Sequence, residues 1–272
     1  MNPAGKNKKS GRGWRLLALA TVVFFIGAGI YFLFITVGES KRIEQTLIDR
    51  HGWANHYTPP MDGSVPANRL ERFIRVRAAV QPNCVILQRI LFEILNLEAI
   101  EESEDLSTGE KMSESLGSFK SMFSFAPSFL EFMDARNLAL LAEEMGIGEY
   151  IYLYLAAYGE QLANDPDAAF ADREETRISP RAREEFAQML INQTAAIEAA
   201  GQDQSMAKLH SELQSEIDGL KGGSHSSPWP NGPPDNTRQA LAPYRDQLTD
   251  LYCSGIVKTE LMQKNRGLNF EG

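Results

Sequence analysis

The sequence predicts an all-α protein: a single N-terminal transmembrane helix followed by an extracytoplasmic bundle of about seven helices. Three observations lead to this prediction. An apolar stretch without ionisable side chains occupies residues 16–37. Beyond it, apolar residues recur with helical spacing, and only 150–154 alternates as a strand would, before it continues as an apolar run. Gly and Pro residues interrupt this pattern at intervals typical of helix length.

The apolar stretch is long enough to cross a bilayer. At ~1.5 Å per residue a helix over 16–37 spans ~33 Å, against a hydrocarbon core of ~30 Å. A cleaved signal peptide usually has a shorter apolar core of ~7–15 residues and ends in a small-residue cleavage site. We therefore expect 16–37 to remain as an anchor in contact with membrane lipid.

The charge around this anchor predicts its orientation. Residues 1–15 hold five basic side chains and no acidic one, whereas all 36 acidic side chains follow the anchor. Basic segments stay in the cytoplasm, so we expect a bacterial inner-membrane protein with a cytoplasmic tail at 1–15 and a periplasmic body.

Composition excludes several classes of function. The net charge of −9 argues against a nucleic-acid partner, because phosphate neutralisation needs a basic surface. Four His and two Cys form no zinc-binding pattern, so we expect no metal site. Walker A, G-x-G-x-x-G, H-E-x-x-H and G-x-S-x-G motifs do not occur, and we therefore expect no cofactor and no enzyme of these classes.

The exported part reads as one helical domain at 66–255, preceded by a juxtamembrane helix and loop at 38–65. Its expected helices lie at 66–80, 83–100, 127–145, 148–163, 179–200, 203–220 and 236–253. We expect Pro82 to form a tight turn that makes the first two helices antiparallel neighbours. Ser179 and Pro180 are typical of a helix N-cap and first position.

Three segments lack a regular pattern. Residues 101–124 are rich in Ser and Glu, and 221–235 are rich in Gly, Pro and Ser, so both are expected to be flexible excursions. Residues 256–272 are expected to form a frayed C-terminal tail.

The two cysteines, Cys84 and Cys253, both follow the anchor. In an oxidising compartment they can form a disulfide, and the alternative is two buried thiols that pack as small apolar groups.

Arg77 is a candidate binding residue, because it interrupts the apolar face formed by Leu70, Phe73, Ile74 and Val80. A buried guanidinium needs an acidic partner, for which Glu144 and Glu93 are the leading candidates. Asn137 and Glu144 share a helix face, flanked by Arg136. The set can form a ligand site or a structural clasp.

Two further patterns are open to two interpretations each. Tyr150, Tyr154 and Tyr158 form an aromatic stripe that is either a binding platform, with Tyr154 as its candidate residue, or part of the core. Arg69, Arg72 and Arg75 form a basic face that either attracts an anionic lipid or glycan, or pairs with Glu71 and other local acids.

These observations favour a non-enzymatic, membrane-anchored helical domain that binds or scaffolds an envelope component, with an envelope protein as partner. One alternative is a carboxylate-based hydrolase acting on an envelope substrate through Glu144 beside Tyr154. Another is a small-ligand-binding module with its pocket around Arg77. Two acids across a deep cleft would favour the first alternative, a closed apolar cavity the second, and an exposed apolar patch a protein partner.

Overall fold

The computed structural model describes residues 38–101, 108–164, 179–201, 204–222, 228–230 and 232–262. The predicted anchor at 16–37 lies outside these residues. Among the helices that are described, none is both long enough and apolar enough to cross a membrane. Chain contacts separate two compact units, Met1–Arg42 and Ile43–Gly272, and everything below concerns the second.

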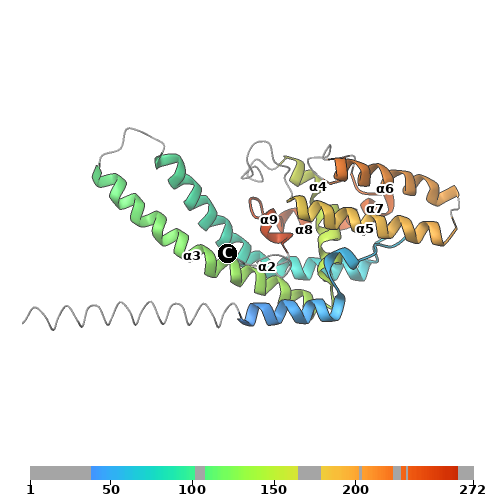
Figure 1. Ribbon diagram of the computed structural model, residues 1–272, viewed down its shortest axis with the longest axis horizontal. Helices are drawn as coiled ribbons and strands as arrows, with labels where there is room; N and C mark the ends of the chain where they lie inside the picture. The colour runs from blue at the N-terminus through green and yellow to red at the C-terminus, as the bar shows by residue number, and fades with distance from the viewer. Residues whose placement is uncertain are drawn as a thin grey trace, which may run out of the picture. The chain divides into compact units, whose positions relative to one another are not determined.

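The regular elements of the described residues are all helices, with no strand, which confirms the all-α prediction for this part of the chain. A helix that ends at residue 51 precedes the 3-10 turn η1 (Ala54–His56). The other elements are α2 (Ala67–Glu101), α3 (Thr108–Ala142), α4 (Ile147–Asn164), α5 (Pro180–Ala199), α6 (Gln204–Gly222), α7 (Asp235–Leu241), η3 (Ala242–Tyr244), α8 (Arg245–Asp250) and α9 (Val257–Glu260) (Figure 1).

The prediction of a turn at Pro82 is wrong, because α2 runs through this residue as one continuous helix. Proline removes the hydrogen bond to the carbonyl four residues earlier, which belongs to Ala78. Ala78 and Pro82 are both exposed, so water can reach that carbonyl. On the opposite side, Val80 and Cys84 are fully buried, and their packing holds the chain helical across the missing bond.

The antiparallel neighbour of α2 is α3 (Figure 1). The predicted antiparallel pair of helices at 66–80 and 83–100 is therefore wrong, since both segments belong to α2. Helix α3 begins at Thr108, within the segment expected to be an irregular excursion, and it passes through Pro127, where we expected the helix to start. It ends at Ala142 in a Schellman motif, in which the Met145 amide donates to the Leu140 carbonyl (2.9 Å).

Helix α4 lies at the centre of the core. From Tyr150 to Ala156 every residue is buried, so α4 is enclosed on all sides. Its first turn contacts η1 at Gly148, where a Cβ atom would lie 2.5 Å from the Ala54 carbonyl oxygen. Only glycine permits this close approach.

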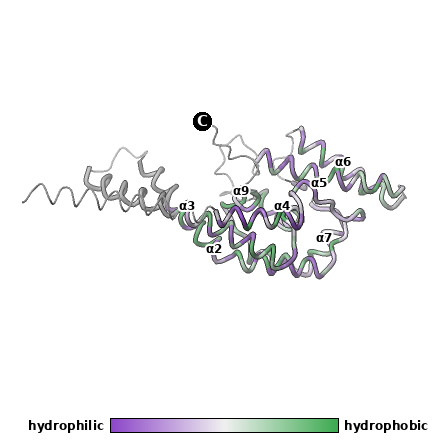
Figure 2. Tube along the Cα trace, turned by 60° about the horizontal axis from the view of Figure 1, so that its bottom comes forward, coloured by the Kyte–Doolittle hydropathy of each residue, from purple (hydrophilic) through white to green (hydrophobic). Residues whose placement is uncertain are grey.

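Helix α5 begins as predicted, with Ser179 as N-cap and Pro180 in the first turn; the Ala182 amide donates to Ser179 Oγ (3.2 Å). Helices α5 and α6 pack against each other. Apolar and polar residues are mixed along both, as Figure 2 shows by hydropathy, and the apolar ones face the core.

Trp229, in the segment expected to be a flexible linker, is buried. Its amide donates to Glu216 Oε1 (2.9 Å), and its ring meets Phe186 edge-on at 5.5 Å.

The predicted helix at 236–253 is divided into α7, η3 and α8 because Pro243 lies within it. The expected frayed tail is also wrong for residues 256–262. There α9 forms one helical turn, and Ile256, Val257, Glu260 and Leu261 are all buried.

Candidate functional site

Arg77 is fully buried on α2, and its acidic partner is Glu260 of α9, not Glu144 or Glu93. Arg77 Nη1 donates to the Glu260 carboxylate and to the hydroxyl of Tyr150 (2.8 Å). Its Nη2 donates to the carbonyl of Leu251 (2.7 Å). The guanidinium therefore binds three acceptors from two distant parts of the chain.

The three tyrosines of the α4 stripe form the aromatic wall of this site. Tyr150 donates its hydroxyl to Glu260 Oε2 (2.6 Å). The rings of Tyr154 and Tyr158 lie 5.1 and 5.4 Å from Arg77 Cζ, within the range of a cation–π contact. All three are fully buried, so the stripe belongs to the core and is not an open platform.

A second buried guanidinium, that of Arg136 on α3, contacts the same acidic residue through its backbone. Arg136 Nη1 donates to the carbonyl of Glu260 (2.6 Å). Its Nε and Nη2 donate to Oδ1 of the neighbouring Asn137 (3.1 and 3.0 Å). The candidate residue Asn137 thus orients Arg136 and belongs to the site through it.

The charges in this cluster are stabilised unequally. Burial lowers the pKa of Arg77, but Glu260 and the three tyrosines together outweigh burial, and the pKa lies well above its usual value. Burial lowers the pKa of Arg136, and the nearby Tyr150, Glu260 and Glu44 do not fully offset it. Burial also raises the pKa of Tyr154 well above its usual value, so it stays a neutral hydroxyl.

The Cys84–Cys253 disulfide joins positions close in sequence to the two central residues of this cluster. Cys84 follows Arg77 by seven residues, and Cys253 precedes Glu260 by seven. The two Cα atoms are 6.3 Å apart, and both residues are buried. The bond joins α2 to the segment that follows α8, three residues before the buried Ile256. It therefore ties the residues that carry Glu260 to the helix that carries Arg77.

Glu144 is not part of this site. It follows α3 with a φ of 49°, and its side chain is 77% exposed. Its carboxylate accepts a hydrogen bond from Arg72 Nη1 (3.0 Å). Tyr154 is fully buried while Glu144 faces solvent, so these two candidate residues do not line one cleft.

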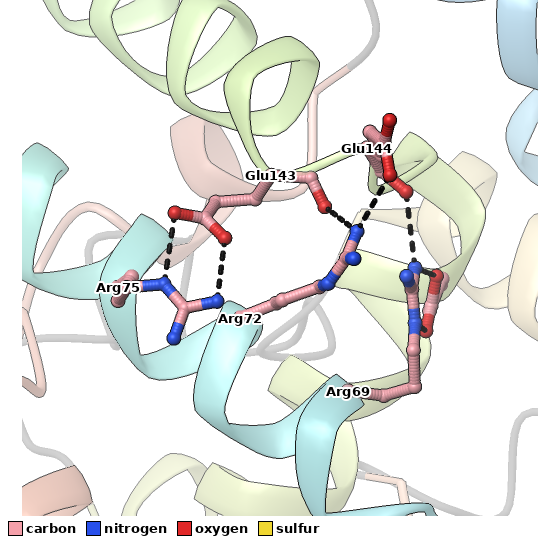
Figure 3. Close-up of polar contacts among 6 residues, drawn as sticks. Arg69, Arg72, Arg75, Glu143 and Glu144 are labelled. Carbon is pink, nitrogen blue, oxygen red and sulfur yellow. Dashed lines mark hydrogen bonds and ion pairs between the residues drawn. The ribbon is translucent and has the colours of Figure 1, made fainter.

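The basic face of α2, Arg69, Arg72 and Arg75, forms a ladder against the turn between α3 and α4 (Figure 3). Arg75 binds both carboxylate oxygens of Glu143 (2.9 and 2.8 Å). Arg72 and Arg69 donate to the carbonyls of Glu143 (2.7 Å) and Glu144 (3.2 Å).

Arg69 also forms an ion pair with Glu149 at the start of α4. The ladder satisfies carbonyls beyond the end of α3, where cations complement the helix dipole. The partners of these guanidiniums are acids and carbonyls of the α3–α4 turn and the start of α4, and not the predicted Glu71. All three guanidiniums therefore form their contacts within the domain.

A separate surface groove of about 600 Å³ has Trp229, Arg238 and Arg245 in its wall, together with residues of α4. None of the predicted site residues lines it. Arg238, one of its basic residues, is already paired with Asp235.

The buried cluster combines two guanidiniums, three neutral phenols and the Glu260 carboxylate, which is held by charge-assisted hydrogen bonds. Among the described residues, no group of three or more His, Cys, Asp or Glu could hold a metal ion.

Sequence reasoning missed Glu260, the central acid of the cluster. Its signal was available, because Glu260 lies among Ile256, Val257 and Leu261 with spacings of four, three and one. One short turn gives too few apolar positions to separate a buried turn from a tail.

Comparisons of this chain with protein-family models, curated proteins and solved structures find no match.

Proposed function

We propose that this protein is anchored in a bacterial inner membrane by residues 16–37 and that its helical domain binds or braces a protein of the cell envelope. The anchor contacts membrane lipid, the basic residues before it stay in the cytoplasm, and the domain lies in the periplasm. The role is one of binding and not of catalysis.

The observation that carries this proposal is the disulfide between Cys84 and Cys253. Disulfides between distant residues persist in oxidising compartments and are rare where cytosolic reductants act. The pair is buried and connects residues 169 positions apart. A disulfide of this kind agrees with export of everything that follows the apolar stretch.

The binding role is supported by an apolar face of α2, which we define by Val85, Ile86 and Phe92. Val85 and Phe92 are seven residues apart and lie on one side of the helix. They are 50% and 64% exposed, and Ile86 beside them is 38% exposed. Exposed apolar side chains that share a helix face are typical of a surface that contacts a protein.

Photo-crosslinking in intact cells tests the binding role. A photoreactive amino acid at Val85 or Phe92 should yield the same discrete adduct with one envelope protein. The matched control is Gln214, an exposed polar position on α6, which should yield no such adduct. If all three positions crosslink alike, or none does, the α2 face is not a partner surface.

Protease treatment tests the compartment independently. Protease added to intact spheroplasts should digest the helical domain. A domain that survives in spheroplasts but is cut after lysis would overturn the periplasmic location, whatever the crosslinks show.

A further inference from the structure

Glu260 reaches the buried cluster from an element different from those of its partners. The cations and phenols lie on α2, α3 and α4, the long helices of the core. Glu260 lies on α9, a single turn of four residues close to the end of the described chain. The cluster is therefore assembled from a three-helix receptacle and a short segment that enters it.

The contacts of this segment resemble those of a bound peptide. Its carboxylate binds Arg77 and Tyr150, and its backbone carbonyl at Glu260 accepts from Arg136 (2.6 Å). Its apolar side chains, Ile256, Val257 and Leu261, are at most 3% exposed. The three helices thus hold a segment that has one acid, apolar residues four and three positions before it, and an apolar residue one position after it.

The three-helix receptacle contains hydrogen-bonding groups that do not bind Glu260. The Tyr154 hydroxyl and Arg77 Nε are buried and have no hydrogen-bond partner among the described residues. A buried ion pair is also not required for stability, because well-packed apolar residues usually serve as well. Two buried guanidiniums and a spare hydroxyl are better explained by a site for a carboxylate than by packing alone.

We propose that residues 256–262 are an internal occupant of a carboxylate-binding site, and that an acidic segment of a partner protein takes the same place. The partner segment carries a carboxylate with apolar residues at the spacings found here. This inference rests on the proposed binding function and names the chemistry of the partner. The Cys84–Cys253 disulfide keeps the displaced segment attached to α2.

Chemical rescue tests the carboxylate site in the full-length chain. Glu260→Ala vacates the site and should lower the Tm. Acetate at ~100 mM, compared with chloride at equal ionic strength, should then raise the Tm of this variant by ~3 °C and that of the wild type by less than ~1 °C. No differential rise in Glu260→Ala would overturn the proposal.

Two matched variants exclude a general effect of acetate. Glu260→Gln fills the space without the charge, so acetate should not rescue it. Glu185→Ala removes another buried carboxylate, but its partner Arg181 is 39% exposed and can be hydrated by water. Rescue of either control to the same extent would also overturn the proposal.

A peptide arm distinguishes a protein segment from a free carboxylate as the natural ligand. The probe is a synthetic peptide of residues 254–262, SGIVKTELM, added to the Glu260→Ala protein and followed by fluorescence anisotropy. The peptide should bind at least ~10-fold more tightly than acetate, and a second peptide that carries the Glu260→Gln substitution should bind at least ~10-fold more weakly than the first. Equal binding of peptide and acetate would reject the partner segment.

Hydrogen exchange on the wild type tests displacement without any substitution. The amides of Glu260 and Leu261 are hydrogen-bonded to the carbonyls of Ile256 and Val257. If the segment opens on its own, these amides should exchange at least ~10-fold faster than those of α4. Exchange at the rate of α4 would mean that the segment leaves only on global unfolding, which contradicts displacement. All these measurements use purified protein and remain valid whatever the crosslinking and protease experiments give.

Discussion

The guanidinium of Arg77 and the carboxylate of Glu260 form an ion pair across 183 positions of the chain, with neither side chain exposed. The pair connects the first long helix of the domain to its last short turn. Because both charges are removed from water, each depends on the other for solvation. This dependence gives the first prediction.

Arg77→Met should lower the free energy of unfolding by ~3–5 kcal/mol, since it leaves the Glu260 carboxylate buried without its main cation. The double variant Arg77→Met/Glu260→Leu removes both charges and should be more stable than Arg77→Met alone. Urea denaturation followed by circular dichroism measures both values. If Arg77→Met unfolds at the wild-type urea concentration, the ion pair has no role in stability.

Glu144→Gly should leave the free energy of unfolding unchanged or raise it by up to ~1 kcal/mol. Glu144 holds a left-handed conformation, with φ at 49°, that glycine adopts without strain. Its ion pair with Arg72 is largely exposed and contributes little. Glu144→Ala keeps the strain and loses the ion pair, so it should be less stable than Glu144→Gly in thermal melts. The reverse order would show that the ion pair outweighs backbone strain.

Local signals predicted the parts of the fold that depend on local chemistry. The Ser179 cap and its helix follow from a side chain that bonds an amide three residues away. The apolar spacing around Tyr150 correctly indicated a helix, although 150–154 alternates like a strand. In both cases the interactions that decide the structure lie within a few residues.

The errors concern contacts between distant residues. Pro82 breaks an isolated helix, but buried neighbours on the far side of α2 hold it together. Glu144 and Glu260 are both acids near apolar residues, and only the tertiary fold decides that Glu260 meets Arg77. The apolar face around Arg77 indicated that its guanidinium needed an acidic partner but not which one.

Gly148→Ala should lower the free energy of unfolding by ~1–3 kcal/mol, because the new Cβ would lie 2.5 Å from the Ala54 carbonyl oxygen and from Tyr57 Cβ. Gly222→Ala is the matched control, since its Cβ would meet nothing within 4 Å at the end of α6. The control should keep wild-type stability or gain slightly in thermal melts. Equal effects of the two substitutions would show that η1 moves away from α4 freely.

Reduction should change both the mobility and the stability of the chain. The oxidised protein should migrate faster than the reduced protein in a denaturing gel, because the disulfide closes a long loop. The chain-entropy model assigns a closure of this length ~5 kcal/mol. The variant Cys84→Ser should lose the mobility difference and unfold at a lower urea concentration. Identical mobility with and without reductant in wild-type protein isolated from cells would mean that the bond does not form there.

The buried tyrosines should make the domain unfold cooperatively in alkali. Burial raises the pKa of Tyr152 from 10.0 to about 12, and it also raises the pKa values of Tyr150, Tyr154 and Tyr158. A pKa that is higher in the folded state means that the folded chain keeps its proton where the unfolded chain loses it. The stability from each tyrosine is therefore complete below pH 10 and declines as the pH rises through the folded pKa.

For Tyr152 this decline amounts to ~3 kcal/mol between pH 10 and 12, at ~1.4 kcal/mol per pH unit. Tyrosinate absorbance and loss of helical circular dichroism should appear together in one steep transition. Tyr152→Phe removes one titrating group, so the free energy of unfolding of this variant should decline less steeply with pH than that of the wild type. Tyrosinate absorbance that reaches its full value near pH 10 while the helices stay intact would show that these phenols are accessible to solvent in the folded domain.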